Sequence, residues 1–266
     1  MNILVIGGNR FAGKGVVEHL VTEDNNVTLL NRTGTGPSGC KYIKCDRRTD
    51  TQLIPFLSNH KYDVILDMCC YDSTDIKTLF DSGVTCNHYI LMSTLLTKEN
   101  TKDGESKASA EHYLGSSAMF PYTIIRSGYM LGKNNPRKRI QYYVEQMKEK
   151  NPFNVNSSGN EPLYVNDVED VITTIINVVN LTHLGTSYRN IINIPGFNTN
   201  TIELISIVNG TILGNYTVTN KQTDTPFDIP IKHQTVSLNN NTLNNLIRKL
   251  TRHYTLIHHY EKILIC

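Results

Sequence analysis

Short apolar runs alternate with stretches of helical periodicity through the first half of the chain. The apolar runs predict strands, and the amphipathic stretches between them predict helices. The predicted strands lie near residues 2–6, 27–31, 41–45, 63–68, 88–92 and 122–126, and the predicted helices near 14–22, 50–57, 73–81, 105–116 and 137–149. Continuous apolar strands separated by helices indicate a parallel sheet covered on both faces. We therefore predict an α/β protein with a Rossmann-type, doubly wound parallel sheet.

The pattern changes after residue 150. Pro152, Ser157 to Asn160 and Pro162 indicate loops. They are followed by a predicted helix from about Asp167, a strand over 191–194, a helix over 201–213 and a last helical segment near 256–265. A chain of 266 residues suits one such domain with an extension. We expect a single domain over 1–266, with the cofactor part mainly in 1–126 and a small C-terminal substrate-binding lobe mainly in 127–266.

The N-terminal segment predicts a phosphate site. The apolar strand Ile3–Ile6 leads directly into Gly7-Gly8-Asn9-Arg10-Phe11-Ala12-Gly13, and a helical pattern follows. In a strand, glycine turn and helix of this kind, the backbone approaches a pyrophosphate and the helix N-terminus supplies unpaired N–H groups. The segment Gly8–Lys14 also fits the start of an NTPase phosphate loop, but Gly15 stands where that loop needs a Ser or Thr for magnesium. Although Val64–Asp67 resembles the metal-binding strand of an NTPase, the dinucleotide interpretation is favoured.

Composition and charge narrow the class of protein. The formal net charge of +2 gives no electrostatic case for nucleic acid as a partner. No leader pattern precedes the first strand and no apolar run approaches the roughly 20 residues that span a bilayer, so we expect a cytoplasmic protein with no membrane partner. The cysteines lack zinc-type spacing, and we expect free thiols and no metal. The oligomeric state stays open between monomer and homodimer.

Several segments together resemble a known family. They are ILVIGGNRFAGK, LLNRTGT with KCDRRTD, YDVILDMCCY, and the later series IIRSGYMLG, PLYVNDVEDVI and INIPG. In their order and spacing the chain resembles the extended short-chain dehydrogenase/reductase superfamily, in its NAD-dependent epimerase/dehydratase family and the chloroplast stem-loop-binding-like subgroup. The resemblance implies the strand order 3-2-1-4-5-6-7 and a substrate lobe built mainly after residue 127.

The resemblance also implies a set of cofactor residues. It places the pyrophosphate at the glycine loop, the adenine near Asp46-Arg47, the nicotinamide ribose near Cys69-Cys70-Tyr71 and the carboxamide near Ser127. The implied cofactor-binding residues are Gly7, Gly8, Asn9, Arg10, Phe11, Gly13, Asn31, Arg32, Asp46, Arg47, Cys69, Cys70, Tyr71, Lys107 and Ser127. Arg10 replaces the central glycine of the family. The second strand ends in Asn31-Arg32 without the carboxylate that would repel a 2′-phosphate, which favours NADP(H) over NAD(H).

The implied catalytic residues are incomplete. Ser93 and Thr94 match the Ser/Thr element of the superfamily, and Lys107 matches its Lys, but Asp103 occupies the Tyr position. A carboxylate beside an ammonium holds almost no proton at neutral pH, so Asp103 is a poor substitute for a phenol. We expect Asp103 to be a helix N-cap or an i,i+4 partner of Lys107. A phenol from Tyr71, Tyr113 or Tyr129 is the alternative donor.

These observations leave more than one function open. The first hypothesis is an NADP(H)-dependent oxidoreductase or epimerase-like enzyme that acts on a small polar or nucleotide-linked substrate. The second is a protein that binds NADP(H) without turnover, as a sensor or a structural partner. RNA binding, which the resemblance adds, is the weakest because the charge is nearly balanced.

Overall fold

The computed structural model describes residues 1–49, 55–58, 60–98, 101–137, 139–149, 160–183 and 189–208. Parts of the predicted helices over 50–57 and 201–213, the loop signals at 152 and 157–159, and the segment near 256–265 lie outside these residues. The chain divides into two compact units. The first comprises Met1–Gly128 and Val168–Ile194, and the second comprises Tyr129–Asp167 and the described residues from Pro195 onward.

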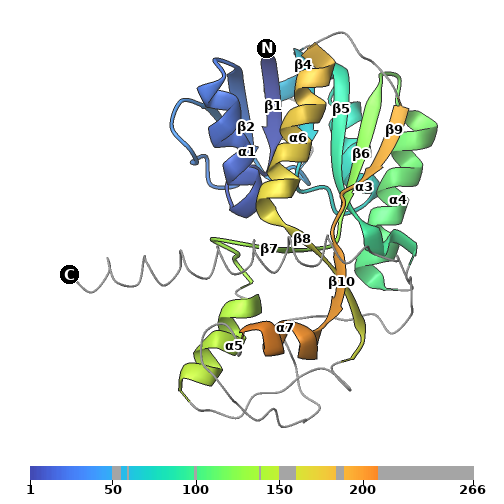
Figure 1. Cartoon of the computed structure of the whole chain (residues 1–266). Helices are drawn as coiled ribbons and strands as arrows, with labels where there is room; N and C mark the ends of the chain where they lie inside the picture. The colour runs from blue at the N-terminus through green and yellow to red at the C-terminus, as the bar shows by residue number, and fades with distance from the viewer. Residues whose placement is uncertain are drawn as a thin grey trace. The chain divides into compact units, whose positions relative to one another are not determined.

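The first unit is built on a parallel sheet. In the described residues its strands are β1 (Asn2–Ile6), β2 (Asn26–Asn31), β3 (Lys41–Lys44), β4 (Lys61–Asp67), β5 (Thr85–Thr94), β6 (Tyr122–Ser127) and β9 (Arg189–Asn193). They are ordered β3-β2-β1-β4-β5-β6-β9, and every neighbouring pair is parallel (Figure 1). This order confirms the predicted Rossmann-type topology. It brings the carboxyl ends of the strands to one edge of the sheet, where such folds bind their ligands.

Helices bury both faces of this sheet. They are α1 (Phe11–Thr22), α3 (Ser73–Asp81), α4 (Lys102–Ser117) and α6 (Val168–His183), with the 3₁₀ turn η1 (Leu95–Lys98) after β5. Leu4 and Ile6 of β1 share a hydrophobic core with α3 and α4, whereas Val5 lies with Val17 of α1 beside Gly8. Because alternate residues of β1 meet a core on each face, the whole strand is apolar, as the sequence predicts.

The second unit contains a small sheet that the hydrophobic pattern did not predict. Its strands are β7 (Tyr129–Leu131), β8 (Pro162–Asp167) and β10 (Phe197–Asn200), in the order β10-β8-β7, with helices α5 (Arg139–Lys148) and α7 (Thr201–Val208). We had expected a loop at Pro162, but it is the first residue of β8, a position where a strand tolerates proline. The other two strands are too short to give a periodic signal.

The part of the chain that the structure describes holds no helix long and apolar enough to cross a membrane.

Candidate functional site

The loop between β1 and α1 has the geometry of an anion site. Gly7 adopts a φ of +86°, which favours glycine, and its N–H donates to the Leu30 carbonyl at 3.0 Å. A Cβ at Gly13 would lie only 3.0 Å from the Cα of Gly8, so the helix starts directly against the loop. Arg10 is the N-cap of α1, yet its side chain makes no capping hydrogen bond. The first-turn amides are therefore left for an anion, at the positive end of the helix dipole.

Arg10 fits this loop because its backbone is extended. Its φ of −140° and ψ of 153° suit any residue, so the position does not need the glycine of the family. The positive φ falls instead on the next residue, Phe11, at 48°. The loop thus keeps the backbone geometry of an anion site, and Arg10 adds a guanidinium beside it.

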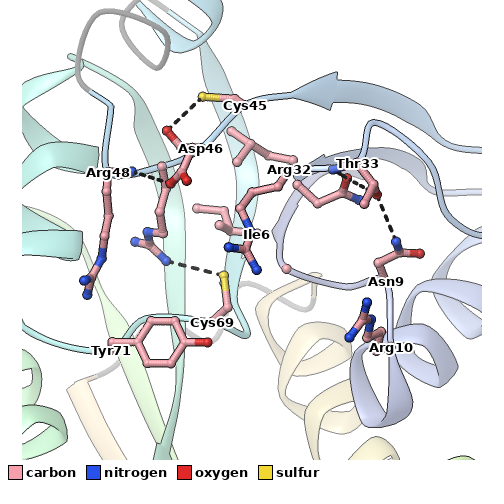
Figure 2. A pocket seen from close by; sticks show the side chains of 14 residues that line it. Ile6, Asn9, Arg10, Arg32, Thr33, Cys45, Asp46, Arg48, Cys69 and Tyr71 are labelled. Carbon is pink, nitrogen blue, oxygen red and sulfur yellow. Dashed lines mark hydrogen bonds between the residues drawn. The ribbon is translucent and has the colours of Figure 1, made fainter. Parts of the chain in front are cut away.

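A cavity of about 550 Å³ opens beside this loop, within the first unit (Figure 2). The ends of β1, β2, β3 and β4 all contribute to it. It is lined by Ile6, Gly7, Asn9, Arg10, Leu30, Asn31, Arg32, Thr33, Cys45, Asp46, Arg47, Arg48, Cys69 and Tyr71. Among the predicted cofactor residues, Gly8, Phe11 and Gly13 lie in the adjoining loop and first helical turn, and Cys70 is fully buried.

The turn after β2 is hydrogen-bonded to the loop between β1 and α1. The Asn31 Oδ1 accepts hydrogen bonds from the Thr33 amide at 3.0 Å and the Gly34 amide at 2.7 Å, which holds the turn. The Asn9 Nδ2 donates to the Thr33 Oγ1 at 3.1 Å. Arg32 lies between these anchored residues and lines the cavity with Arg10. The guanidinium groups of Arg10 and Arg32 therefore line this side of the cavity, and the end of β2 contributes no carboxylate to it.

A buried ion pair stands behind the opposite wall. The Arg47 guanidinium donates to both oxygens of Asp67, at 2.6 and 2.8 Å, and the Tyr89 hydroxyl donates to the same carboxylate at 2.7 Å. Burial alone would lower the pKa of Arg47, but the Asp67 carboxylate holds it well above its usual value. Burial, reinforced by the Asp67 charge, raises the pKa of Tyr89. Arg47 is therefore committed to Asp67, a partner that the sequence reasoning missed.

Burial raises the pKa of both adjacent thiols above the ordinary value. Cys69 lines the cavity against Gly7, and burial raises its pKa to about 11. Cys70 is completely buried, and burial raises its pKa still further. No disulfide involves Cys40, Cys45, Cys69, Cys70 or Cys86, and no cluster of metal-binding side chains occurs among the described residues.

The predicted catalytic residues lie at the ends of β5 and β6 and on α4. The buried Ser93 Oγ donates to Glu111 Oε1 at 2.5 Å, and Glu111 also pairs with Arg126. The Thr94 Oγ1 donates to the carbonyl of the buried Ser127 at 3.3 Å. This arrangement brings Ser93, Thr94 and Ser127 together, with their hydroxyl or carbonyl groups engaged by protein.

Lys107 reaches the adjoining strand ends. Its Nζ donates to the Cys70 carbonyl at 2.5 Å and to the Met92 carbonyl at 3.0 Å. These contacts place its ammonium next to the loop that carries Tyr71. The charge is therefore fixed at the sheet edge by backbone oxygens.

Asp103 does not have the capping role that we expected. Helix α4 begins at Lys102, and its N-cap is Thr101, whose Oγ1 accepts a hydrogen bond from the Gly104 amide at 3.1 Å. Asp103 is exposed in the first turn, and no ion pair joins it to Lys107. Both structural roles predicted for it are thus wrong. The helix starts earlier than its apolar periodicity indicated, so the cap is another residue, and the Lys107 ammonium donates to two backbone carbonyls instead.

The alternative phenols occupy different places. Tyr113 packs beside Phe80, with 6.4 Å between ring centroids, at the margin of the hydrophobic core. Tyr129 belongs to the second unit. Tyr71 lines the cavity of the first unit and is 62% exposed.

The chain is similar in sequence to a known protein over part of its length. No protein-family model matches the sequence. The chain is 26% identical over 208 residues to the chloroplast stem-loop binding protein of 41 kDa b from Arabidopsis thaliana, covering 66% of this chain and 54% of the relative. The chain thus spans about half the length of this curated relative.

Solved structures share the fold at low sequence identity. A UDP-N-acetylglucosamine 4-epimerase from Methanobrevibacter ruminantium, in complex with UDP-N-acetylmuramic acid, superposes with a TM-score of 0.71 at 16% identity, covering 96% of this chain and 98% of the other. A dTDP-glucose 4,6-dehydratase from Streptomyces venezuelae with bound NAD and TYD gives a TM-score of 0.70 at 17% identity, covering 93% and 96%. The resemblance predicted from the sequence motifs is confirmed.

Proposed function

Starting from this resemblance, we propose that the chain is an NADP(H)-binding enzyme of the short-chain dehydrogenase/reductase type. Its substrate would be a small polar or nucleotide-linked molecule, in an oxidoreductase or epimerase-like reaction. The structural neighbours include enzymes captured with NAD or with nucleotide-linked sugars, which supports both the cofactor class and the substrate class. We propose the cytoplasm as its location.

The observation that carries the proposal is the uncapped start of α1 beside a cavity that Arg10 and Arg32 line. The first-turn amides and Gly7 suit a pyrophosphate. Arg10 and Arg32 suit the additional phosphate on the adenosine ribose, because charge-assisted hydrogen bonds to phosphate are strong. A cavity of about 550 Å³ is large enough for a nucleotide.

The residues of this chain would divide the work between binding and orientation. When bound, the nicotinamide supplies hydride transfer. Lys107 would hold the nicotinamide ribose at the sheet edge, next to the carbonyls it already contacts. Thr94 would orient a substrate hydroxyl or carbonyl. Arg47 would support the cavity wall through its ion pair with Asp67, and neighbouring residues would contact the cofactor directly.

Cofactor titration tests the proposal. We expect NADPH to bind about ten- to a hundredfold more tightly than NADH, and Arg32→Ala to remove most of that preference. Lys41→Ala, which removes an exposed cation of β3 outside the cavity lining, is the control and should leave the preference intact. Equal affinities in the parent, or an unchanged preference in Arg32→Ala, would refute the assignment of NADP(H).

Two observations favour a second candidate, a protein that binds NADP(H) without turnover. The position of the superfamily Tyr holds the exposed Asp103, and Ser93 is engaged by the buried Glu111. Single-turnover mixing of the NADPH complex with oxidised nucleotide sugars distinguishes the two. Loss of NADPH absorbance supports the enzyme. Tight NADPH binding with no change in that absorbance supports the sensor or structural partner.

A further inference from the structure

An exposed aromatic ring stands at the edge of the cavity. Tyr71 follows β4, lines the cavity, and is 62% exposed. The Cζ of Arg48 lies 5.5 Å from the centroid of this ring, which is within cation–π range. A large aromatic surface left to solvent beside a guanidinium is a surface on which a planar group can stack.

Both groups are positioned by a single buried carboxylate. Asp75 lies in the first turn of α3 and is 1% exposed. Its Oδ2 accepts the Tyr71 amide at 2.7 Å, and its Oδ1 accepts the Arg48 Nε at 2.9 Å. Burial alone would raise the pKa of Asp75, but the hydrogen bonds from Arg48 and from the Tyr71 amide lower it below its usual value. The carboxylate is therefore charged and holds the two loops together.

A second carboxylate also binds the Arg48 guanidinium. Its Nη2 donates to Asp72 Oδ2 at 3.0 Å, and Asp72 is the N-cap of α3. The guanidinium is half-exposed, with 53% of its side chain accessible. It is thus held along one edge by carboxylates while the rest of its surface stays open.

The order of groups along the cavity indicates what would stack there. The phosphate loop, with Asn9 and Arg10, lies on one side, whereas Arg48 and Tyr71 lie on the other (Figure 2). Arg32 extends from the end of β2 between them. In a dinucleotide the ribose separates phosphate from base, so the base must lie beyond Arg32, at the ends of β3 and β4.

We propose that Tyr71 and Arg48, held by Asp75, form a stacking platform for the purine base of the adenosine half of the cofactor. This inference rests on the proposed function, and it moves Tyr71 from the nicotinamide ribose, where the family pattern puts it, to the adenine end. A π-face stacks on any purine without reading the sugar phosphate. The platform therefore contributes to NADPH and NADH binding equally, whereas Arg32 distinguishes between them.

The experiment compares removal of the Tyr71 ring with removal of its hydroxyl alone. The dissociation constants of NADPH, NADH and 2′,5′-ADP are measured by calorimetry for the parent, Tyr71→Ala, Tyr71→Phe and Phe56→Ala. Phe56 is an exposed aromatic, 44% accessible, outside the cavity lining. We expect Tyr71→Ala to weaken all three ligands by about tenfold with the NADPH to NADH ratio unchanged. Tyr71→Phe and Phe56→Ala should match the parent.

The outcomes separate this inference from the proposed function. Parent-like affinities in Tyr71→Ala would overturn the platform and leave the proposed function standing. A loss for NADPH alone, or an equal loss in Tyr71→Phe, would also overturn it, because the ring face would not be the contact. A parent protein that binds neither dinucleotide would overturn the proposed function and the platform together.

Discussion

At the ends of β1, β2 and β3 the polar side chains surround a cavity, whereas at the ends of β5 and β6 they are bonded to other groups of the protein. Arg10 and Arg32 line the open cavity. Ser93 is engaged by Glu111, and Lys107 by two backbone carbonyls. Both regions belong to the same unit and the same edge of one sheet.

The difference separates binding from chemistry. Groups that surround a cavity are available to a ligand without breaking anything first, whereas groups already bonded to protein must give up those bonds. A pre-formed cavity is the usual state of a cofactor site. The cavity region is therefore open to a ligand as it stands, whereas a catalytic step in the second region would need its groups to exchange partners.

The largest expected effect comes from the buried Arg47–Asp67 ion pair behind the cavity. Asp67→Asn leaves the buried Arg47 without its full counter-charge, so we expect the free energy of unfolding to fall by about 3–5 kcal/mol in a urea titration. Asp81→Asn, an exposed carboxylate at the end of α3, is the matched control and should change little. An Asp67→Asn protein as stable as the parent would mean that the ion pair does not stabilise the fold.

Lys107→Met examines the second region. It removes two charged hydrogen bonds to carbonyls, so we expect a loss of stability of about 2 kcal/mol and weaker NADPH binding in a folded protein. Lys102→Met, an exposed lysine of the same helix, should leave both quantities unchanged. A variant that loses stability but binds NADPH like the parent would give Lys107 a purely structural role.

The smallest effect is expected at Asp103. Asp103→Asn removes an exposed charge from the first turn of α4, where the helix dipole favours it, and should cost less than about 1 kcal/mol of stability. Any NADPH-linked activity should change far less than the roughly 10²- to 10⁴-fold effect of losing a general acid or base. A collapse of activity in the folded, NADPH-binding variant would show that Asp103 occupies the catalytic role.

The strand order could be predicted from the sequence because buried parallel strands have a strong pattern. Ile3–Ile6 is apolar at every position since β1 lies between β2 and β4 with a core on each face. The strand Phe197–Asn200 had no comparable signal, because it is only four residues long and three of them are polar. Short strands are specified by their partners, and single-chain periodicity does not contain that information.

The candidate site was predicted in part for a similar reason. Local spacing identified the glycine loop and Arg32, which line or adjoin the cavity. The partnership of Arg47 with Asp67 spans 20 positions and that of Tyr71 with Asp75 depends on where α3 starts, so neither follows from a local motif. Asp75 has one usable signal, an acidic residue in a first helical turn after a strand end.

The two hydrogen bonds that Asp75 accepts from separate loops also have a kinetic consequence. Since one carboxylate bonds both to the loop after β3 and to the loop after β4, neither has to be ordered by the incoming nucleotide. Little conformational entropy is then lost on association. Encounter, steered by the cationic residues of the cavity, would set the rate at which the nucleotide arrives, and differences in affinity among variants of this wall would appear in how long it stays.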